Sequence, residues 1–253
     1  MGGAYPLRQC AVMDKEEQKH MDRVEEARRT LLALYGGSHS PLEESDPDFA
    51  AIKQRLVYGE LYAQEALDPV MRELILLAVA TTNQTMSEVK LHTCAALRSG
   101  ASPEAVKEPV YHCAPYIGLG KAEAAAAAVN EVLRTQGISL PLASQRTVSE
   151  EDRLTAGIAA QKSIFGPHID EMRAAAPNDK KPLQDYLSAY CFGDFYTRSG
   201  LDIRQRELLT FSILSAQGGC ENQIKAHAGG NAAVGNDKPL LLAALMLCMP
   251  YIG

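Results

Sequence analysis

Apolar side chains recur every three or four residues along most of the chain, which is the period of an α-helix. Over residues 15–35, for example, Val24, Ala27 and Leu31 fall on one helical face. The run LILLAVA at 74–80 is apolar on nearly every side, which predicts a helix that neighbours cover on several faces. No segment shows the clean period-two alternation of a half-buried strand, so the sequence predicts an all-α protein. The same spacing, with capping and breaking residues, predicts helices over residues 15–35, 49–64, 70–82, 86–98, 103–116, 121–136, 149–165, 183–196, 203–216, 221–233 and 237–249.

The chain contains one pattern twice. The segment RELILLAVATTNQTMSEVKLH at 72–92 returns as RELLTFSILSAQGGCENQIKAH at 206–227, with one residue inserted before the final histidine. Equivalent residues therefore differ by 134 up to the Arg-Glu pairs and by 135 from the histidines onward. The second offset holds through the run PYIG, which stands at 115–118 and again at 250–253. The sequence is a tandem duplication, and a functional site in one copy is expected in both.

The duplication predicts the domain organisation. We expect an N-terminal repeat over 1–137, of which 1–13 are disordered, a linker over 138–148, and a C-terminal repeat over 149–253. In the first repeat an Ala-rich helix follows the PYIG run, whereas the second repeat stops at that run. We therefore hypothesise that the second repeat lacks its last helix.

Charge and composition narrow the classes of partner. The 253 residues are 46% hydrophobic and 22% charged, which is typical of a soluble globular protein. The net charge of -6 argues against binding to nucleic acid or to an anionic membrane surface. The N-terminus lacks a secretory signal, no apolar run reaches membrane-spanning length, and the six cysteines show no metal or disulfide spacing. We expect a cytoplasmic protein with reduced cysteines and no bound metal.

The first copy carries the stronger candidate for acid–base chemistry. Glu88 and His92 are four residues apart on one predicted helix, so both side chains emerge from the same face. A carboxylate beside an imidazole is a usable general acid–base unit, because the pKa of histidine is easily brought near working pH. Glu73 lies one helix upstream and is a further acid–base or orienting candidate.

The second copy is related but not equivalent. Glu207 and His227 stand in the same relation as Glu73 and His92, but Gln223 replaces Glu88. Cys220 lies seven residues before His227, and Thr85 occupies its place in the first copy.

Structural roles explain several of these residues equally well. The pairs Arg72-Glu73 and Arg206-Glu207 could form a buried charge cluster, so structure and catalysis stay open for both glutamates. Tyr116 and Tyr251 are interpreted as packing residues beside helix-ending glycines. The histidines without a counterpart in the other copy are interpreted as incidental, and these are His20, His39, His112 and His168.

The duplicated segments resemble the carboxymuconolactone decarboxylase family, which includes the AhpD-type alkylhydroperoxidases. The first resembling segment contains LDPVMRELILLAVA and MSEVKLHTCAALRSGASPEAVKEPVYHCAPYIGLGKAEAA, and the second is FGDFYTRSGLDIRQRELLTFSILSAQGGCENQIKAHAGGNAAVG. The resemblance covers roughly residues 50–135 and 185–253. It implies an all-helical fold of two fused AhpD-like repeats, and a homotrimer that mimics a hexamer of single-repeat members.

The AhpD branch uses a Glu, a CxxC pair and a His in a thiol relay. The resemblance places the CxxC positions on Thr85 and Glu88 in the first copy and on Cys220 and Gln223 in the second. Neither copy has both thiols, so no disulfide can close within either motif. A thiol-dependent peroxidase or redox protein that uses Cys220 alone is kept as the alternative function.

The Glu-x3-His pattern of the first copy is more similar to the decarboxylase branch, which acts on γ-carboxymuconolactone without metal or organic cofactor. The resemblance implies a decarboxylase or related acid–base enzyme for a small carboxylated lactone or ring-cleavage acid. His92 would donate the proton, Glu88 would set its tautomer and pKa, Glu73 would assist, and His227 would serve similarly in the second copy. The candidates for binding substrate carboxylates are Arg72, Arg98 and Arg206. A non-catalytic assembly module on the same scaffold is the third possibility, because the Glu-x3-His pair is intact in one copy.

Overall fold

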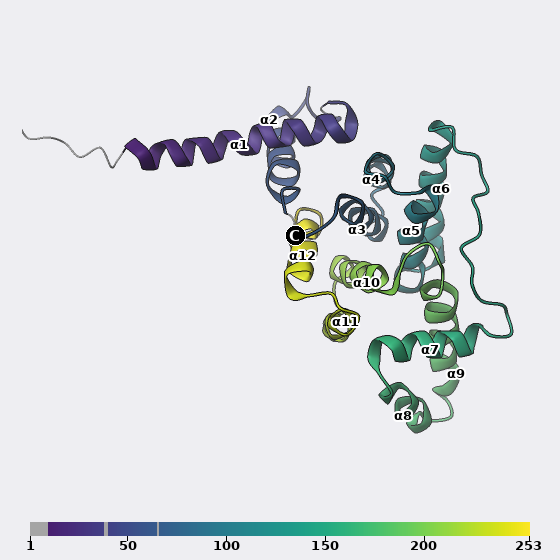
Figure 1. Ribbon diagram of the computed structural model, residues 1–253. Helices are drawn as coiled ribbons and strands as arrows, with labels where there is room; N and C mark the ends of the chain where they lie inside the picture. The colour runs from purple at the N-terminus through teal and green to yellow at the C-terminus, as the bar shows by residue number, and fades with distance from the viewer. Residues whose placement is uncertain (1–9, 38–39, 65) are drawn as a thin grey trace, which may run out of the picture. The chain divides into compact units, whose positions relative to one another are not determined.

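The structure, a computed structural model, describes residues 10–37, 40–64 and 66–253. It is helical, and no strand occurs within these ranges, so the all-α prediction is confirmed. The chain forms two compact units, 1–65 and 66–253 (Figure 1). The predicted repeat boundaries stay a prediction, because the compact units divide the chain by packing and not by sequence repetition. The disorder predicted for 1–13 falls mainly on residues outside the described ranges.

The first unit is a helix packed along a π-helix. Its elements are α1 (Cys10–Tyr35), α2 (Pro47–Gln54) and the π-helix η1 (Arg55–Leu61). Gly59 presses its backbone against α1, where a Cβ would lie 2.1 Å from the carbonyl oxygen of Arg23. Only glycine permits this approach, and it sets how closely α1 and η1 pack.

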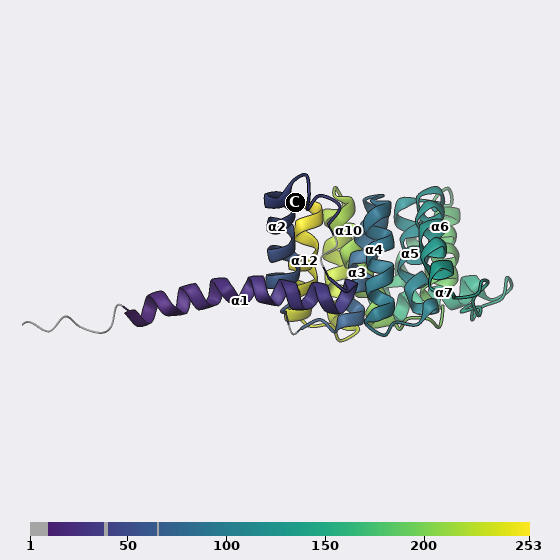
Figure 2. The same ribbon diagram turned by 90° about the horizontal axis from the view of Figure 1, so that it is seen from above.

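The second unit contains the remaining helices. They are α3 (Pro69–Thr82), α4 (Met86–Arg98), α5 (Pro103–Ile117), α6 (Leu119–Thr135), α7 (Arg153–Phe165), α8 (His168–Ala175), α9 (Lys181–Tyr186), the π-helix η2 (Leu187–Tyr196), α10 (Ile203–Gln217), α11 (Glu221–Ala233) and α12 (Lys238–Ile252). Figure 2 shows α4, α5, α6, α10 and α12 standing nearly parallel. Asp68 and Asp202 cap α3 and α10 by accepting backbone N–H hydrogen bonds from Met71 and Gln205.

The two central helices, α3 and α10, pack against each other and against both α5 and α12. The apolar run at 74–80 of α3 is buried throughout, which confirms that neighbours cover this helix on several faces. The helix that ends in the PYIG run, α5 in the first repeat and α12 in the second, thus contacts the central helix of the other repeat. Residues of one repeat are thereby placed beside the functional candidates of the other.

The helix pair of the first unit has a counterpart in the second. There α7 packs on η2, and a Cβ on Gly193 would lie 2.2 Å from the carbonyl oxygen of Arg153. Gly193 is the residue that the offset of 134 pairs with Gly59. The same glycine contact in both copies supports the prediction of two fused helical repeats.

Several boundaries differ from the predictions. The helix expected from residue 15 begins at Cys10, and the helices expected over 49–64 and 183–196 each contain a π-helical segment. The helix expected from Ser149 begins at Arg153, because the Ser149 amide and hydroxyl donate to Asp152 and form a turn first. Helix α8 was not expected from the spacing. Periodicity locates a helix, but it does not reveal a widened turn or a short helix between two others.

Candidate functional site

The first site consists of Glu73, Glu88 and His92. Glu73 projects from the buried helix α3, and the other two project from one face of α4, as their spacing predicts. His92 Nδ1 lies 2.9 Å from Glu73 Oε2, and His92 Nε2 lies 3.6 Å from Glu88 Oε2. The imidazole is therefore held between two carboxylates, and the fold brings together all three residues that the sequence selected.

Burial and charge act against each other at His92. The ring is fully buried, and Tyr251 from the other repeat meets it edge-on with ring centroids 5.9 Å apart. Burial alone lowers the pKa of His92, but the hydrogen bonds and charges of Glu73 and Glu88 outweigh it, so that the pKa is raised. Glu88 is the partly exposed member, with 20% of its side chain accessible. The arrangement favours an imidazolium that can donate a proton on the Glu88 side.

The second site consists of Glu207 on α10 and His227 on α11. His227 Nδ1 lies 2.9 Å from Glu207 Oε2, which repeats the geometry of the first site. Phe165 meets the His227 ring edge-on, with centroids 5.3 Å apart. Gly230 faces the carboxylate, since a Cβ there would lie 2.6 Å from Glu207 Oε2. Gln223, in place of Glu88, is exposed, so this histidine has one carboxylate partner.

A buried polar network lies behind Glu207. The Tyr196 hydroxyl donates to Glu207 Oε1 at 2.7 Å and lies 2.7 Å from Thr210 Oγ1. Thr210 Oγ1 also lies 2.9 Å from His112 Nε2 and 3.1 Å from the Tyr116 hydroxyl. The prediction that His112 is incidental is therefore wrong, and Tyr116 does more than pack. One signal in the sequence could have indicated this role: His112 lies among apolar residues of its helix. An imidazole that is buried there needs a hydrogen-bond partner.

The network is uncharged apart from its carboxylate. Burial raises the pKa of Tyr116 and of Tyr196 well above that of an ordinary phenol, so both hydroxyls keep their protons. Burial also lowers the pKa of His112 well below its ordinary value, and the nearby charge of Arg206 adds to this. His112 is accordingly a neutral ring.

Cys220 precedes α11 as its N-cap residue and is partly exposed. Its thiol hydrogen-bonds the carbonyl oxygen of Gly218 at 3.3 Å. A hydrogen bond joins Glu207 and His227, whereas the Cys220 thiol bonds a residue of its own loop. The thiols of Cys113, Cys191 and Cys248 are different, since burial raises the pKa of each to about 12.

The structure separates the three candidate arginines. Arg206 is fully buried, and its Nη2 lies 2.9 Å from Glu108 Oε2, so it is a structural ion-pair residue. Arg72 is half-buried and donates to the Leu67 carbonyl oxygen at 3.3 Å. Arg98 is exposed in the last turn of α4, the helix that carries Glu88 and His92. Of the three, Arg98 is the exposed one.

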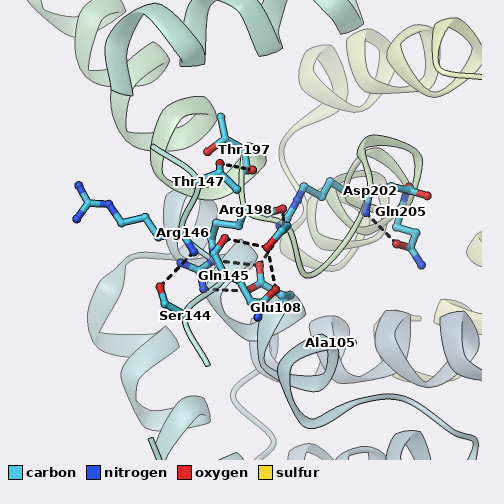
Figure 3. A network of polar contacts seen from close by, with 12 residues as sticks. Ala105, Glu108, Ser144, Gln145, Arg146, Thr147, Thr197, Arg198, Asp202 and Gln205 are labelled. Carbon is cyan, nitrogen blue, oxygen red and sulfur yellow. Dashed lines mark hydrogen bonds and ion pairs between the residues drawn. The ribbon is translucent and has the colours of Figure 1, made fainter. Parts of the chain in front are cut away.

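The predicted linker lies beside the ion pair of Glu108 with Arg198. Arg198 donates to Glu108 through Nε at 2.9 Å, and Figure 3 shows both beside the segment 144–147. Hydrogen bonds hold that segment to the residues after η2: Ser199 N donates to Gln145 O at 3.0 Å, Ser199 Oγ donates to Gln145 Oε1 at 2.8 Å, and Thr147 Oγ1 donates to Thr197 O at 2.7 Å. The linker is therefore attached to the second repeat.

Two negative findings apply to the part of the chain that the structure describes. No helix there is long and apolar enough to cross a membrane. No group of three or more His, Cys, Asp or Glu side chains is arranged there to hold a metal ion.

The comparisons with known proteins agree with the duplicated site. The chain matches the Carboxymuconolactone decarboxylase family over residues 47–131 and 181–253. It is 29% identical over 98 residues to the 4-carboxymuconolactone decarboxylase of Acinetobacter baylyi, and this similarity spans 39% of the chain and 73% of that protein. Each matched region contains one Glu–His pair, and together the regions exceed half of the chain. The protein therefore belongs to the carboxymuconolactone decarboxylase family.

Proposed function

We propose that the chain is a cytoplasmic, cofactor-independent decarboxylase or closely related acid–base enzyme that acts on a small carboxylated lactone or ring-cleavage acid. The observation that carries this proposal is the His92 imidazole, which lies 2.9 Å from Glu73 and 3.6 Å from Glu88. Two carboxylates stabilise the imidazolium form of a buried histidine, and an imidazolium is a suitable acid near neutral pH. The relative from Acinetobacter baylyi, named a 4-carboxymuconolactone decarboxylase, supports the choice of substrate class.

The proposed chemistry needs one proton from the protein. Loss of carbon dioxide leaves its bonding electron pair on the substrate as a dienolate. His92 protonates that anion from Nε2, and the ring regains a proton from water. Glu73 positions the ring through Nδ1, and Glu88 keeps it cationic before transfer. Arg98, the exposed one of the three candidate arginines, would bind a substrate carboxylate.

The experiment is to measure carbon dioxide release from γ-carboxymuconolactone by the wild type, His92→Gln and His227→Gln. We expect kcat to fall about 10²- to 10⁴-fold in His92→Gln, since this is the usual contribution of a general acid. His227→Gln is the matched control, because it removes the same imidazole–carboxylate pair from the second site. No release by the wild type, or full activity of His92→Gln, would refute the proposal.

The second candidate is a thiol-dependent peroxide reduction, which the partial exposure of Cys220 at the start of α11 supports. Attack on a peroxide requires an accessible sulfur, because the thiolate is the reactive form of cysteine. Peroxide consumption that Cys220→Ser abolishes and His92→Gln leaves intact would select this function. If neither substrate is turned over and the biological effect survives His92→Gln, the non-catalytic assembly role becomes the better explanation.

We also propose that the chain forms a homotrimer that mimics a hexamer of single repeats. Exposed apolar side chains on α12 support self-association, and they recur at the spacing of one helical face. They are Leu242, Leu245, Met246 and Met249.

A further inference from the structure

The two sites differ most in what lies behind the carboxylate. Thr210 and His112 of the second site correspond, by the offsets of 134 and 135, to Leu76 and Leu247. Both leucines are buried, so the first site has apolar side chains at the two positions that Thr210 and His112 occupy in the second. The Thr210 hydroxyl and the His112 imidazole are therefore present in the second site alone of the two.

These groups hold the Tyr196 phenol in one orientation. Its oxygen lies 2.7 Å from Thr210 Oγ1, and Thr210 in turn lies 2.9 Å from His112 Nε2. The single hydrogen of the phenol is donated to Glu207 Oε1 at 2.7 Å, so the phenol oxygen accepts from Thr210. A charge-assisted bond of this kind is short and directional, so it fixes the plane of the Glu207 carboxyl group.

The fixed carboxylate in turn selects one form of His227. Glu207 Oε2 accepts at 2.9 Å from Nδ1, which must then carry the ring proton. In the neutral ring the lone pair is left on Nε2, and no described residue hydrogen-bonds that atom. The His227 side chain is 12% exposed, whereas His92 is completely covered and has a carboxylate at its Nε2.

We propose that Tyr196 is a positioning residue of a second acid–base site, in which Glu207 and the Tyr196–Thr210–His112 network hold His227 as a general base with a free Nε2. This base takes a proton from a small molecule with an acidic C–H or O–H bond. The proton moves to Nε2, the electron pair stays on the substrate anion, and Glu207 balances the charge of the imidazolium. The two repeats therefore carry sites of opposite function, an acid at His92 and a base at His227. The inference goes beyond the proposed decarboxylase, because it concerns a different site and needs no lactone substrate.

The test is the tautomer of His227 in ¹⁵N-labelled protein, since ring nitrogen shifts distinguish a protonated from an unprotonated nitrogen. Spectra are recorded at about pH 8.5, above the ordinary histidine pKa of about 6.5. The His227 signals are those that His227→Gln removes. We expect the Nδ1–H form in the wild type and a fall in the ratio of Nδ1–H to Nε2–H of about three- to tenfold in Tyr196→Phe, because a hydrogen bond to the carboxylate is lost.

Tyr116→Phe is the matched control. It removes a buried hydroxyl of the same network that contacts Thr210 and Tyr196 but makes no bond to Glu207, so it should leave the tautomer unchanged. An Nε2–H form in the wild type, or the same tautomer ratio in Tyr196→Phe and Tyr116→Phe, would overturn the proposal. If Tyr196→Phe does not fold, Thr210→Val removes the anchor of the phenol instead. A smaller fall in the ratio then supports the proposal, and an unchanged ratio overturns it.

Discussion

At the scale of single residues, one side chain separates the environments of the two histidines. His92 has a carboxylate near each nitrogen, whereas His227 has Gln223 in the sequence position of Glu88. An amide carries no negative charge, so Gln223 cannot pair with an imidazolium as Glu88 can. The i,i+4 spacing predicted the contact of Glu88 with His92. The Nδ1 contact with Glu73 required the packing of α3 on α4.

Replacing Glu88 by the glutamine of the second site should change how carbon dioxide release depends on pH. Glu88→Gln should lower the pKa of His92, because it removes one of the contributions that raise it. A general acid is active while protonated, and its activity is lost as pH rises through its pKa. The loss of carbon dioxide release at alkaline pH should therefore begin at lower pH in Glu88→Gln.

The pH–rate profile of the same decarboxylation measures this shift. Gln223→Glu introduces the complementary change in the second site and should leave the profile of the first site in place. An alkaline limb that does not move in Glu88→Gln would show that Glu88 does not act through His92.

A second residue-scale prediction uses adjacent glycines on α11. A Cβ on Gly229 would meet nothing within 4 Å, whereas one on Gly230 would lie 2.6 Å from Glu207 Oε2 and 2.9 Å from Ile164. Gly229→Ala should raise the free energy of unfolding by about 0.5–1 kcal/mol, because alanine is the better helix former. Gly230→Ala should lower it by about 1–3 kcal/mol through overpacking. Urea denaturation measures both, and equal effects would contradict the close contact at Glu207.

At the scale of elements, a buried ion pair joins the two repeats. Glu108 on α5 is paired with Arg206 on α10 and with Arg198 beyond η2. The sequence raised a buried cluster of Arg206 with Glu207, but the structure pairs Arg206 with Glu108 instead. Residues 98 positions apart form this contact, so neighbouring sequence could not indicate it.

Removal of the carboxylate charge should be costly. Glu108→Gln leaves the Arg206 guanidinium buried without its counter-charge, and we expect a loss of about 3–5 kcal/mol in the free energy of unfolding. Glu123→Gln, at an exposed position of α6, is the control and should change stability by about 0.5 kcal/mol or less. Similar urea midpoints for the two variants would show that Glu108 does not stabilise the contact between α5 and α10.

At the scale of the whole molecule, the duplication gives two related sites that differ in the residues behind the carboxylate. Helix α5 of the first repeat contacts α10, and α12 of the second repeat contacts α3. Tyr116 therefore lies in the network of the second site, and Tyr251 lies against His92. Each site is consequently built from both repeats. A substitution in one repeat can therefore alter the site whose Glu–His pair belongs to the other repeat.

The proposed assembly is tested at this scale. A homotrimer of the 27.4 kDa chain should give a mass of about 82 kDa in sedimentation equilibrium, three times the chain mass. Leu245→Glu together with Met249→Glu should reduce that mass, because both side chains belong to the exposed apolar face of α12. Met172→Glu, at an exposed position of α8, is the control and should leave the mass unchanged. Sedimentation equilibrium decides, and a wild-type monomer would refute the trimer.

The sequence by itself determined the helical class, the duplication and the two Glu–His pairs. These features depend on local periodicity and on a constant offset between copies, both of which are present in the order of residues. Tertiary structure alone decided that His112 lies behind Glu207 through Thr210 and Tyr196, that Tyr116 lies beside these residues, and that Arg206 pairs with Glu108. The physical reason is that buried polar groups must find partners, and which partners they meet is set by how α5 packs against α10 and η2.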